Sequence, residues 1–175
     1  MATDDKRKSG GGKLSRSETV TVRLDPKLRY LAELAARKQR RTLSSYIEWA
    51  IEESLNAVVI EEDKIFDGKN NLSVAGAASS LWDVDEPDRF VKLAIRYSDM
   101  LTHEEQILWK LIRENGLLWH GKYSNNTSGE WVWRVEEESL NVEYLREYWE
   151  AFKAVANGKA KKDTLPTWFK NPPAF

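Results

Sequence analysis

The sequence predicts a mostly helical α+β protein in two parts: a small strand-helix-helix (βαα) unit that dimerises through its strand, and an ααββα domain. Three observations support this prediction. An alternating β-branched segment precedes two amphipathic helical segments, the net charge changes sign along the chain, and the C-terminal half contains several aromatic-rich helical and strand patterns.

Length and charge support the division into two parts. The 175 residues are enough for a small module and a domain of about 100 residues. Residues 1–57 contain 12 Lys and Arg against 8 Asp and Glu, a net charge of +4, whereas residues 58–175 contain 15 against 20, a net charge of −5. A basic N-terminal segment therefore precedes an acidic C-terminal segment. DNA responds to such local charge rather than to the total net charge of −1.

Composition argues against several classes of protein. Without cysteine the chain has no disulfide, no thiolate zinc site and no cysteine nucleophile. No apolar run approaches the roughly 18 residues that span a bilayer, and the basic N-terminus lacks the apolar stretch of a signal peptide. We therefore expect a cytoplasmic protein with no membrane partner.

Residues 1–17 are expected to form a flexible basic arm, because they include three consecutive glycines and too few apolar side chains to fold alone. The arm either contacts DNA phosphates or serves only as a solubilising tail. Its basic residues are Lys6, Arg7, Lys8, Lys13 and Arg16.

The segment from Glu18 to Leu24 alternates between polar and β-branched or apolar side chains, which predicts a half-buried β-strand. One face would carry Val20, Val22 and Leu24, and the opposite face would carry Thr19, Thr21 and Arg23.

Two amphipathic helices are predicted to follow the strand. Asp25 and Pro26 supply an N-cap and a first helical proline, and this helix is expected to run to about Gln39. Thr42 is expected to cap a second helix that continues into the high fifties. One strand and two helices cannot close a core, so we expect residues 18–60 to form a homodimer. The dimer would bury Val20, Val22, Leu24, Leu31, Ile47 and Ile51.

The sequence TVTVRLDPKLRYLAELAARKQRRTLSSYIEWAIEESL, residues 19–55, resembles the ribbon-helix-helix family of DNA-binding proteins, which includes Arc, MetJ and CopG-like repressors. TVRL, an amphipathic helix and S-x-Y-I-x-x-A-I in this order are typical of the family. The family usually has glycine between its two helices, where this sequence has Arg40 and Arg41.

The resemblance implies an antiparallel ribbon, made by two protomers, that enters the major groove of double-stranded DNA. The base-contacting residues would be Thr19, Thr21 and Arg23, of which the arginine can donate two hydrogen bonds to guanine. The N-terminus of the second helix would contact a phosphate through the backbone amides of Ser44 and Ser45. The alternatives are a solvated strand face and a helix cap with a purely structural role.

Residues 61–80, rich in turn-forming and small residues, are predicted to be a linker, and residues 81–158 an aromatic-rich acidic ααββα domain. Its first two helices follow Pro87 and a capping box at Thr102. Gly116 is predicted to end the second helix, and Asn141 to cap the last one, which ends before Gly158.

Between these helices a hairpin is predicted, with strands over 117–123 and 130–135. Trp131, Trp133 and Val135 would share one face of it. The tryptophans expected in the core are Trp109, Trp119, Trp131 and Trp149.

Three aromatic residues are interpreted as interdomain or partner contacts. Residues 159–175 form a tail rich in proline and aromatic side chains, in which Trp168 and Phe169 would dock on the domain or bind a partner. Trp49 falls on the outer face of the second helix and would need a cover. That cover is the ααββα domain, a neighbouring dimer on tandem DNA sites, or a separate protein.

The sequence contains no constellation that predicts catalysis, a metal site or a cofactor. The candidates lack diagnostic spacing; they are His103, His120, Glu104, Glu105 and Glu130. We expect a transcriptional repressor, autoregulating or antitoxin-like, whose C-terminal domain binds a partner or senses a ligand. The alternatives are a DNA-architecture factor for plasmid partition or conjugation and, less favoured, a DNA-tethered enzyme.

Overall fold

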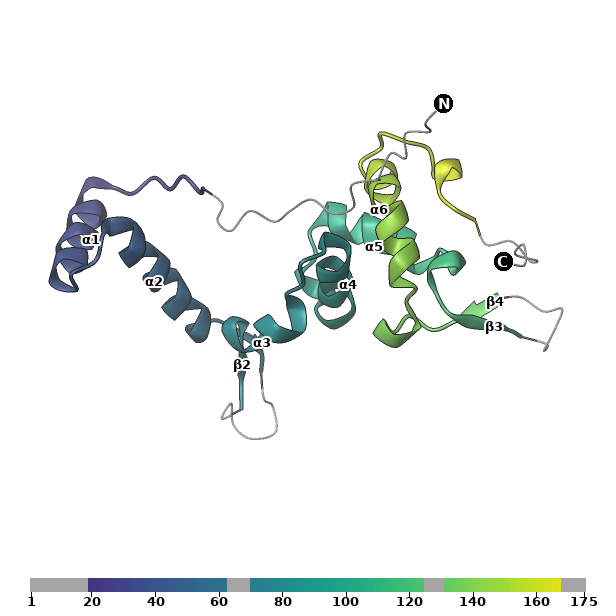
Figure 1. The fold of residues 1–175 in the computed structure, drawn as a ribbon, viewed down its shortest axis with the longest axis horizontal. Coiled ribbons are helices and arrows are strands. Elements are labelled where there is room, and N and C mark those ends of the chain that lie inside the picture. The colour runs from purple at the N-terminus through teal and green to yellow at the C-terminus, as the bar shows by residue number, and fades with distance from the viewer. Residues whose placement is uncertain (1–18, 63–69, 125–130, 168–175) are drawn as a thin grey trace, which may run out of the picture. The chain divides into compact units, whose positions relative to one another are not determined.

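The computed structural model describes residues 19–62, 70–124 and 131–167, which form a mostly helical α+β chain with two small antiparallel sheets (Figure 1). The chain divides into two compact units, Met1–Ser80 and Leu81–Phe175. The division falls where the predicted linker ends. No helix in the described ranges is long and apolar enough to cross a membrane.

Helix α1, Pro26–Lys38, begins at the predicted residue. The side chain of Asp25 accepts hydrogen bonds from the backbone N–H groups of Lys27 and Leu28, both at 3.0 Å, and so caps the helix. The helix ends one residue before the predicted end, with Gln39 as its C-cap.

Helix α2, Leu43–Ala57, follows the predicted cap, since Thr42 Oγ1 accepts a hydrogen bond from the backbone N–H of Ser45 at 3.1 Å. In the turn between α1 and α2, Arg40 has a φ of 56°, in the left-handed region that glycine adopts at least cost. The turn that lacks the expected glycine therefore keeps a glycine-like backbone conformation.

The strand predicted over residues 18–24 is not formed in the single chain, because residues 19–25 belong to neither helix nor strand. A strand is defined by backbone hydrogen bonds to a neighbouring strand. No described strand pairs with this segment, and the prediction assigned that role to a second protomer. Residue 18 lies outside the described residues.

The predicted linker, residues 61–80, contains more regular structure than expected. Strand β1, Val59–Glu61, pairs antiparallel with β2, Leu72–Ser73, and helix α3, Val74–Leu81, follows directly. The hydroxyl of Ser73 accepts a hydrogen bond from the backbone N–H of Gly76 at 3.1 Å, which caps α3. The small-residue run is helical because alanine is the strongest helix former.

The C-terminal unit contains three longer helices, α4 (Glu86–Arg96), α5 (His103–Arg113) and α6 (Val142–Ala156). The capping box at Thr102 is confirmed: its backbone N–H donates to Glu105 Oε2 at 2.8 Å, and its hydroxyl accepts from the Glu105 N–H at 3.3 Å. The side chain of Asn141 caps α6, as predicted. Short 3-10 helices occur at Ser98–Met100, Gly116–Leu118, Glu137–Ser139 and Lys162–Thr164.

The predicted hairpin is present but short. Strand β3, Gly121–Tyr123, pairs antiparallel with β4, Trp131–Trp133, with Lys122 opposite Val132. The ααββα order is confirmed. Val135 lies beyond β4 and is 38% exposed, so it does not extend the face that Trp131 and Trp133 share.

The prediction that Gly116 ends α5 is wrong. The helix ends at Arg113, and Gly116 instead begins a 3-10 helix that faces β4. A Cβ atom at this position would lie 3.1 Å from the Trp133 ring and 3.2 Å from Trp131 Cδ1. The glycine is therefore explained by close packing under the two tryptophans.

The core of the C-terminal unit lies between its three longer helices and the segment that leads into β3. Trp119 lies in this core, and its indole N–H donates to the carbonyl of Ile112 at 3.0 Å. The predicted burial is confirmed for Trp109, Trp119 and Trp149, whereas Trp131 is only half-buried.

Candidate nucleic-acid interface

The three predicted base-contacting residues lie in the segment that precedes α1. Thr19, Thr21 and Arg23 are exposed in the single chain. The opposite face is also exposed, because Val20 is 80% exposed and Val22 is 60% exposed. The segment therefore presents to solvent both the side chains expected to contact DNA and those expected to enter a core.

Helices α1 and α2 present a second set of exposed apolar side chains. Of the residues in the two helices only Ala36 is buried, and α2 contains no buried residue along its 15 positions. Two predicted dimer-core residues, Leu31 and Ile51, are exposed, and Ile47 is half-buried. The large aliphatic side chains that are exposed on the pair are Leu28, Leu31, Leu34, Ile51 and Leu55.

The N-terminus of α2 carries both backbone amides that are predicted to contact phosphate. The N–H of Ser45 donates to the Thr42 hydroxyl, so this amide is occupied by the cap. For Ser44, the structure gives its backbone N–H no hydrogen bond within the described residues. The cap is compatible with a phosphate contact at this helix end, so the contact of Ser45 stays a prediction, and Ser44 keeps a donor at the positive end of the helix dipole.

The turn between α1 and α2 carries basic side chains that the sequence interpretation did not assign to the interface. Arg37 lies 3.9 Å from Glu33, whereas Lys38, Arg40 and Arg41 form no ion pair within the described ranges. The signal was present in the sequence as the run RKQRR, residues 37–41. These cations flank the free amide of Ser44 in sequence and add positive charge beside it.

Trp49 is half-buried, and part of its cover comes from its own unit. The guanidinium carbon of Arg41 lies 5.3 Å from the centroid of the indole ring, within cation–π range. The ring of Tyr46 lies 5.6 Å away on the same helix. This partial cover differs from the three covers expected from the sequence, because the turn between α1 and α2 brings an arginine over the ring.

The remaining predicted contacts fall outside the described residues. They are the basic residues of the N-terminal arm, Lys6, Arg7, Lys8, Lys13 and Arg16, and the two aromatic residues of the tail, Trp168 and Phe169. Glu130, one of the acids considered for catalysis, is outside them as well.

Three carboxylates in the C-terminal unit lie close enough together to be considered as metal ligands. Oxygen atoms of Asp83, Asp85 and Asp88 all lie within 4.8 Å of one another. Cations of the protein already compensate them: Lys92 Nζ lies 2.7 Å from Asp83, and Arg146 pairs with both other aspartates. The cluster is therefore explained as an ion-pair network.

The pKa values in this network follow from the pairing. The hydrogen bond from Lys92 lowers the pKa of Asp83, and the backbone N–H of Asp85 adds to this effect. The hydrogen bonds from Arg146 to Asp88 raise the pKa of that guanidinium. The charged forms of both groups are thereby favoured.

The two histidines are separated from any such cluster. His103 and His120 are both exposed, and neither belongs to the carboxylate group described above. The structure brings no described base or acid to them in a geometry that defines an active site.

Comparisons of the chain with protein-family models, with curated proteins and with solved structures found no match.

Proposed function

We propose that the protein is a homodimeric, sequence-specific DNA-binding protein that acts as a transcriptional repressor. The observation that carries this proposal is the helix pair α1–α2, which is well capped but has almost no buried side chain of its own. Burying a large apolar side chain is worth roughly 1.5–3 kcal/mol, so a second copy covering this face would stabilise both.

Pairing of residues 19–24 from two copies would complete the unit. An antiparallel ribbon would satisfy the backbone groups of this segment and turn Val20 and Val22 toward the helices. Thr19, Thr21 and Arg23 would then project from the opposite face, and a two-stranded ribbon fits the major groove of DNA.

Backbone contacts would fix the ribbon in its groove. The backbone N–H of Ser44 suits phosphate oxygens, and so do Lys38, Arg40 and Arg41, which form no ion pair with a described residue; such contacts orient a protein on DNA without reading its sequence. The basic arm, residues 1–17, would add contacts that respond strongly to salt.

The C-terminal unit is proposed to bind a partner or to sense a ligand. Its support is that the unit has a core of its own, in which Ile112, Leu145 and Phe152 are fully buried. A repressor bound at its operator blocks access to the promoter, and such a unit would regulate that binding.

The proposal is tested by selecting DNA fragments from a random pool with the full chain. We expect enrichment of a short inverted or direct repeat, because a symmetric dimer reads two half-sites. A pool from which no common sequence emerges at physiological salt would contradict sequence-specific binding.

A further inference from the structure

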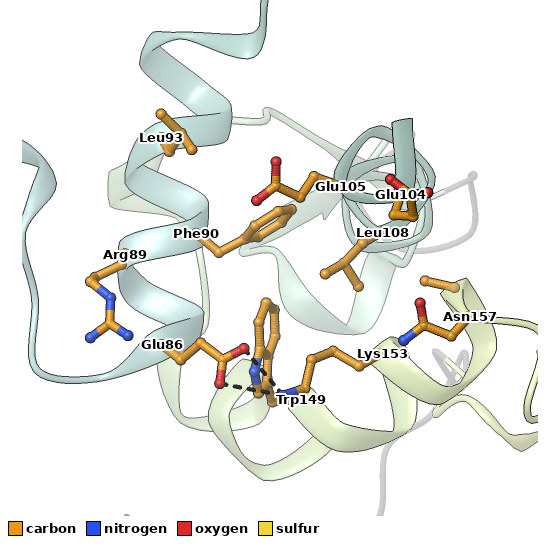
Figure 2. A pocket seen from close by; sticks show the side chains of 11 residues that line it. Glu86, Arg89, Phe90, Leu93, Glu104, Glu105, Leu108, Trp149, Lys153 and Asn157 are labelled. Carbon is orange, nitrogen blue, oxygen red and sulfur yellow. Dashed lines mark hydrogen bonds and ion pairs between the residues drawn. The ribbon is translucent and has the colours of Figure 1, made fainter. Parts of the chain in front are cut away.

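The C-terminal unit contains a cavity of about 390 Å³ between α4, α5 and α6 (Figure 2). Its apolar wall comes from all three helices: Phe90 on α4, Leu108 on α5 and Trp149 on α6. The rings of Phe90 and Trp149 lie 5.4 Å apart between their centroids. This volume falls in the range of small-molecule sites, and an apolar wall with a few polar groups is typical of them.

The charges around the cavity are unbalanced in favour of carboxylates. Glu86, Glu104 and Glu105 line it, together with two cations, Arg89 and Lys153. Glu105 is held by the capping box at the start of α5. Glu104, one residue earlier, forms no ion pair within the described part of the chain and is exposed.

Neither cation neutralises Glu104. Arg89 is directed away from the cavity in Figure 2: its Nη1 donates to the carbonyls of Asp83 and Val84 at 2.7 and 3.0 Å, and its guanidinium stacks 4.8 Å from the centroid of Trp82. The positive charge of Arg89 therefore lies outside the cavity.

Lys153, the other cation, is shared by two carboxylates. Its Nζ lies 3.1 Å from Glu86 and 2.8 Å from Glu150. Burial lowers the pKa of Lys153, but the hydrogen bonds to Glu150 and Glu86 outweigh this effect and raise it. The lysine stays charged and fully compensated, so the carboxylates around the cavity keep an excess of negative charge.

One polar atom of the cavity wall lacks a partner. Trp149 is 5% exposed, and its indole Nε1 is buried without a hydrogen bond to any described residue. Buried indole N–H groups are normally paired, as Trp119 is in the same core. A bound water would supply the acceptor that this N–H lacks.

We propose that this cavity binds a small organic cation, an amine with an aromatic or aliphatic body. The body packs against Phe90, Leu108 and Trp149, and the ammonium lies on the side of Glu104. Aromatic faces attract cations, and the acidic rim disfavours anions of the same shape. This inference rests on the proposed sensing role of the C-terminal unit, but not on DNA binding.

The experiment uses the nitrogen-labelled full chain without DNA and 3-phenylpropylamine as the probe. The chain has eight tryptophans, and the indole resonance of Trp149 is assigned from Trp149→Phe. We expect a saturable shift of that resonance with the amine and no shift with 3-phenylpropanoate, an anion with the same body. No saturable shift, or equal binding of amine and acid, overturns the proposal.

Two variants locate the site. Glu104→Gln should weaken amine binding on the order of fivefold, whereas Glu147→Gln, at an exposed position on α6 that does not line the cavity, should leave it unchanged.

Ala156→Leu adds volume to the cavity wall and should weaken binding of the amine, with the other indole resonances reporting that the fold is kept. Equal affinities for Glu104→Gln and Glu147→Gln overturn the proposal, and so does unaltered binding by a folded Ala156→Leu protein. DNA selection, measured separately, reports on the repressor proposal alone.

Discussion

The two units use their apolar side chains in opposite ways. In the C-terminal unit, large side chains such as Ile112, Trp119 and Phe152 are buried among the helices. In the described part of the N-terminal unit the buried residues are two alanines, Ala36 and Ala77, while leucines and an isoleucine face solvent. Good helix caps can therefore define the helices of a unit without giving it a core.

The largest expected effect is on the exposed face of the N-terminal unit. Ile51→Lys should destabilise a dimer by roughly 3–6 kcal/mol, because two side chains worth about 1.5–3 kcal/mol each would no longer be buried. Glu53→Lys, on the same helix, is the matched control and should have little effect on association. The measurement is sedimentation over a range of concentrations. If Ile51→Lys and Glu53→Lys associate equally well, the exposed apolar face of the N-terminal unit is not a dimer interface.

The second-largest expected effect is the loss of stability when a core side chain of the C-terminal unit is shortened. Phe152 is fully buried, and Phe152→Ala should cost about 3–5 kcal/mol of unfolding free energy through lost burial and a cavity. Denaturation followed by tryptophan fluorescence would measure it. The loss of unfolding free energy should be the same at every protein concentration, because this core lies within one chain. A loss that depends on concentration would show that a second chain contributes to the core.

A substitution in the ribbon should change specificity rather than association. Arg23→Ala removes the proposed contact with guanine and should reduce the discrimination between selected and random DNA by roughly 1–3 kcal/mol. The dimer and the salt-dependent background binding should persist. Competition binding at fixed salt would compare the affinities for selected and random DNA. Unchanged discrimination in the variant would show that Arg23 of the proposed ribbon does not contact the bases.

The turn between α1 and α2 allows a gain in stability. Arg40 has a φ of 56°, so Arg40→Gly should relieve left-handed strain of about 1 kcal/mol, partly offset by the greater flexibility of glycine when unfolded. In thermal unfolding, the midpoint temperature of the N-terminal helices should rise slightly. Arg41→Gly provides the comparison and should not stabilise the unit, so a rise there instead would contradict the assigned turn geometry.

The smallest effect is at acid pH in the C-terminal unit. The folded pKa of Asp83 lies below the ordinary value of 3.8, so its contribution to stability is present above that pH and is lost as pH falls through the folded pKa. Asp83→Asn should flatten the fall in stability below about pH 4 relative to the wild type. Acid titrations followed by circular dichroism that superimpose for the two proteins would contradict the role of the Lys92 pair.

Local signals in the sequence predicted most helix starts. Asp25, Thr42, Thr102 and Asn141 each cap a helix through a hydrogen bond made within three residues, so the information is contained in a short stretch of chain. The small-residue run before Leu81 is helical although turn-forming residues precede it, because alanine has a high helix propensity.

Features that depend on distant contacts were less predictable. The role of Gly116 depends on two tryptophans of β4, and the cover of Trp49 depends on a turn that brings Arg41 over the ring. Similarly, the cavity of the C-terminal unit needs three helices separated in sequence, and no spacing rule relates Glu104 to Trp149. The strand over residues 18–24 remains a prediction, because the bonding partner proposed for it belongs to a second copy.

The claim that the N-terminal unit is half of a dimer is tested most directly by the mass of the intact wild-type chain in solution. Sedimentation equilibrium at micromolar concentration should give twice the 20.2 kDa of one chain, with the helices of both units formed. A fully folded species of 20.2 kDa that persists as the concentration rises would contradict the account.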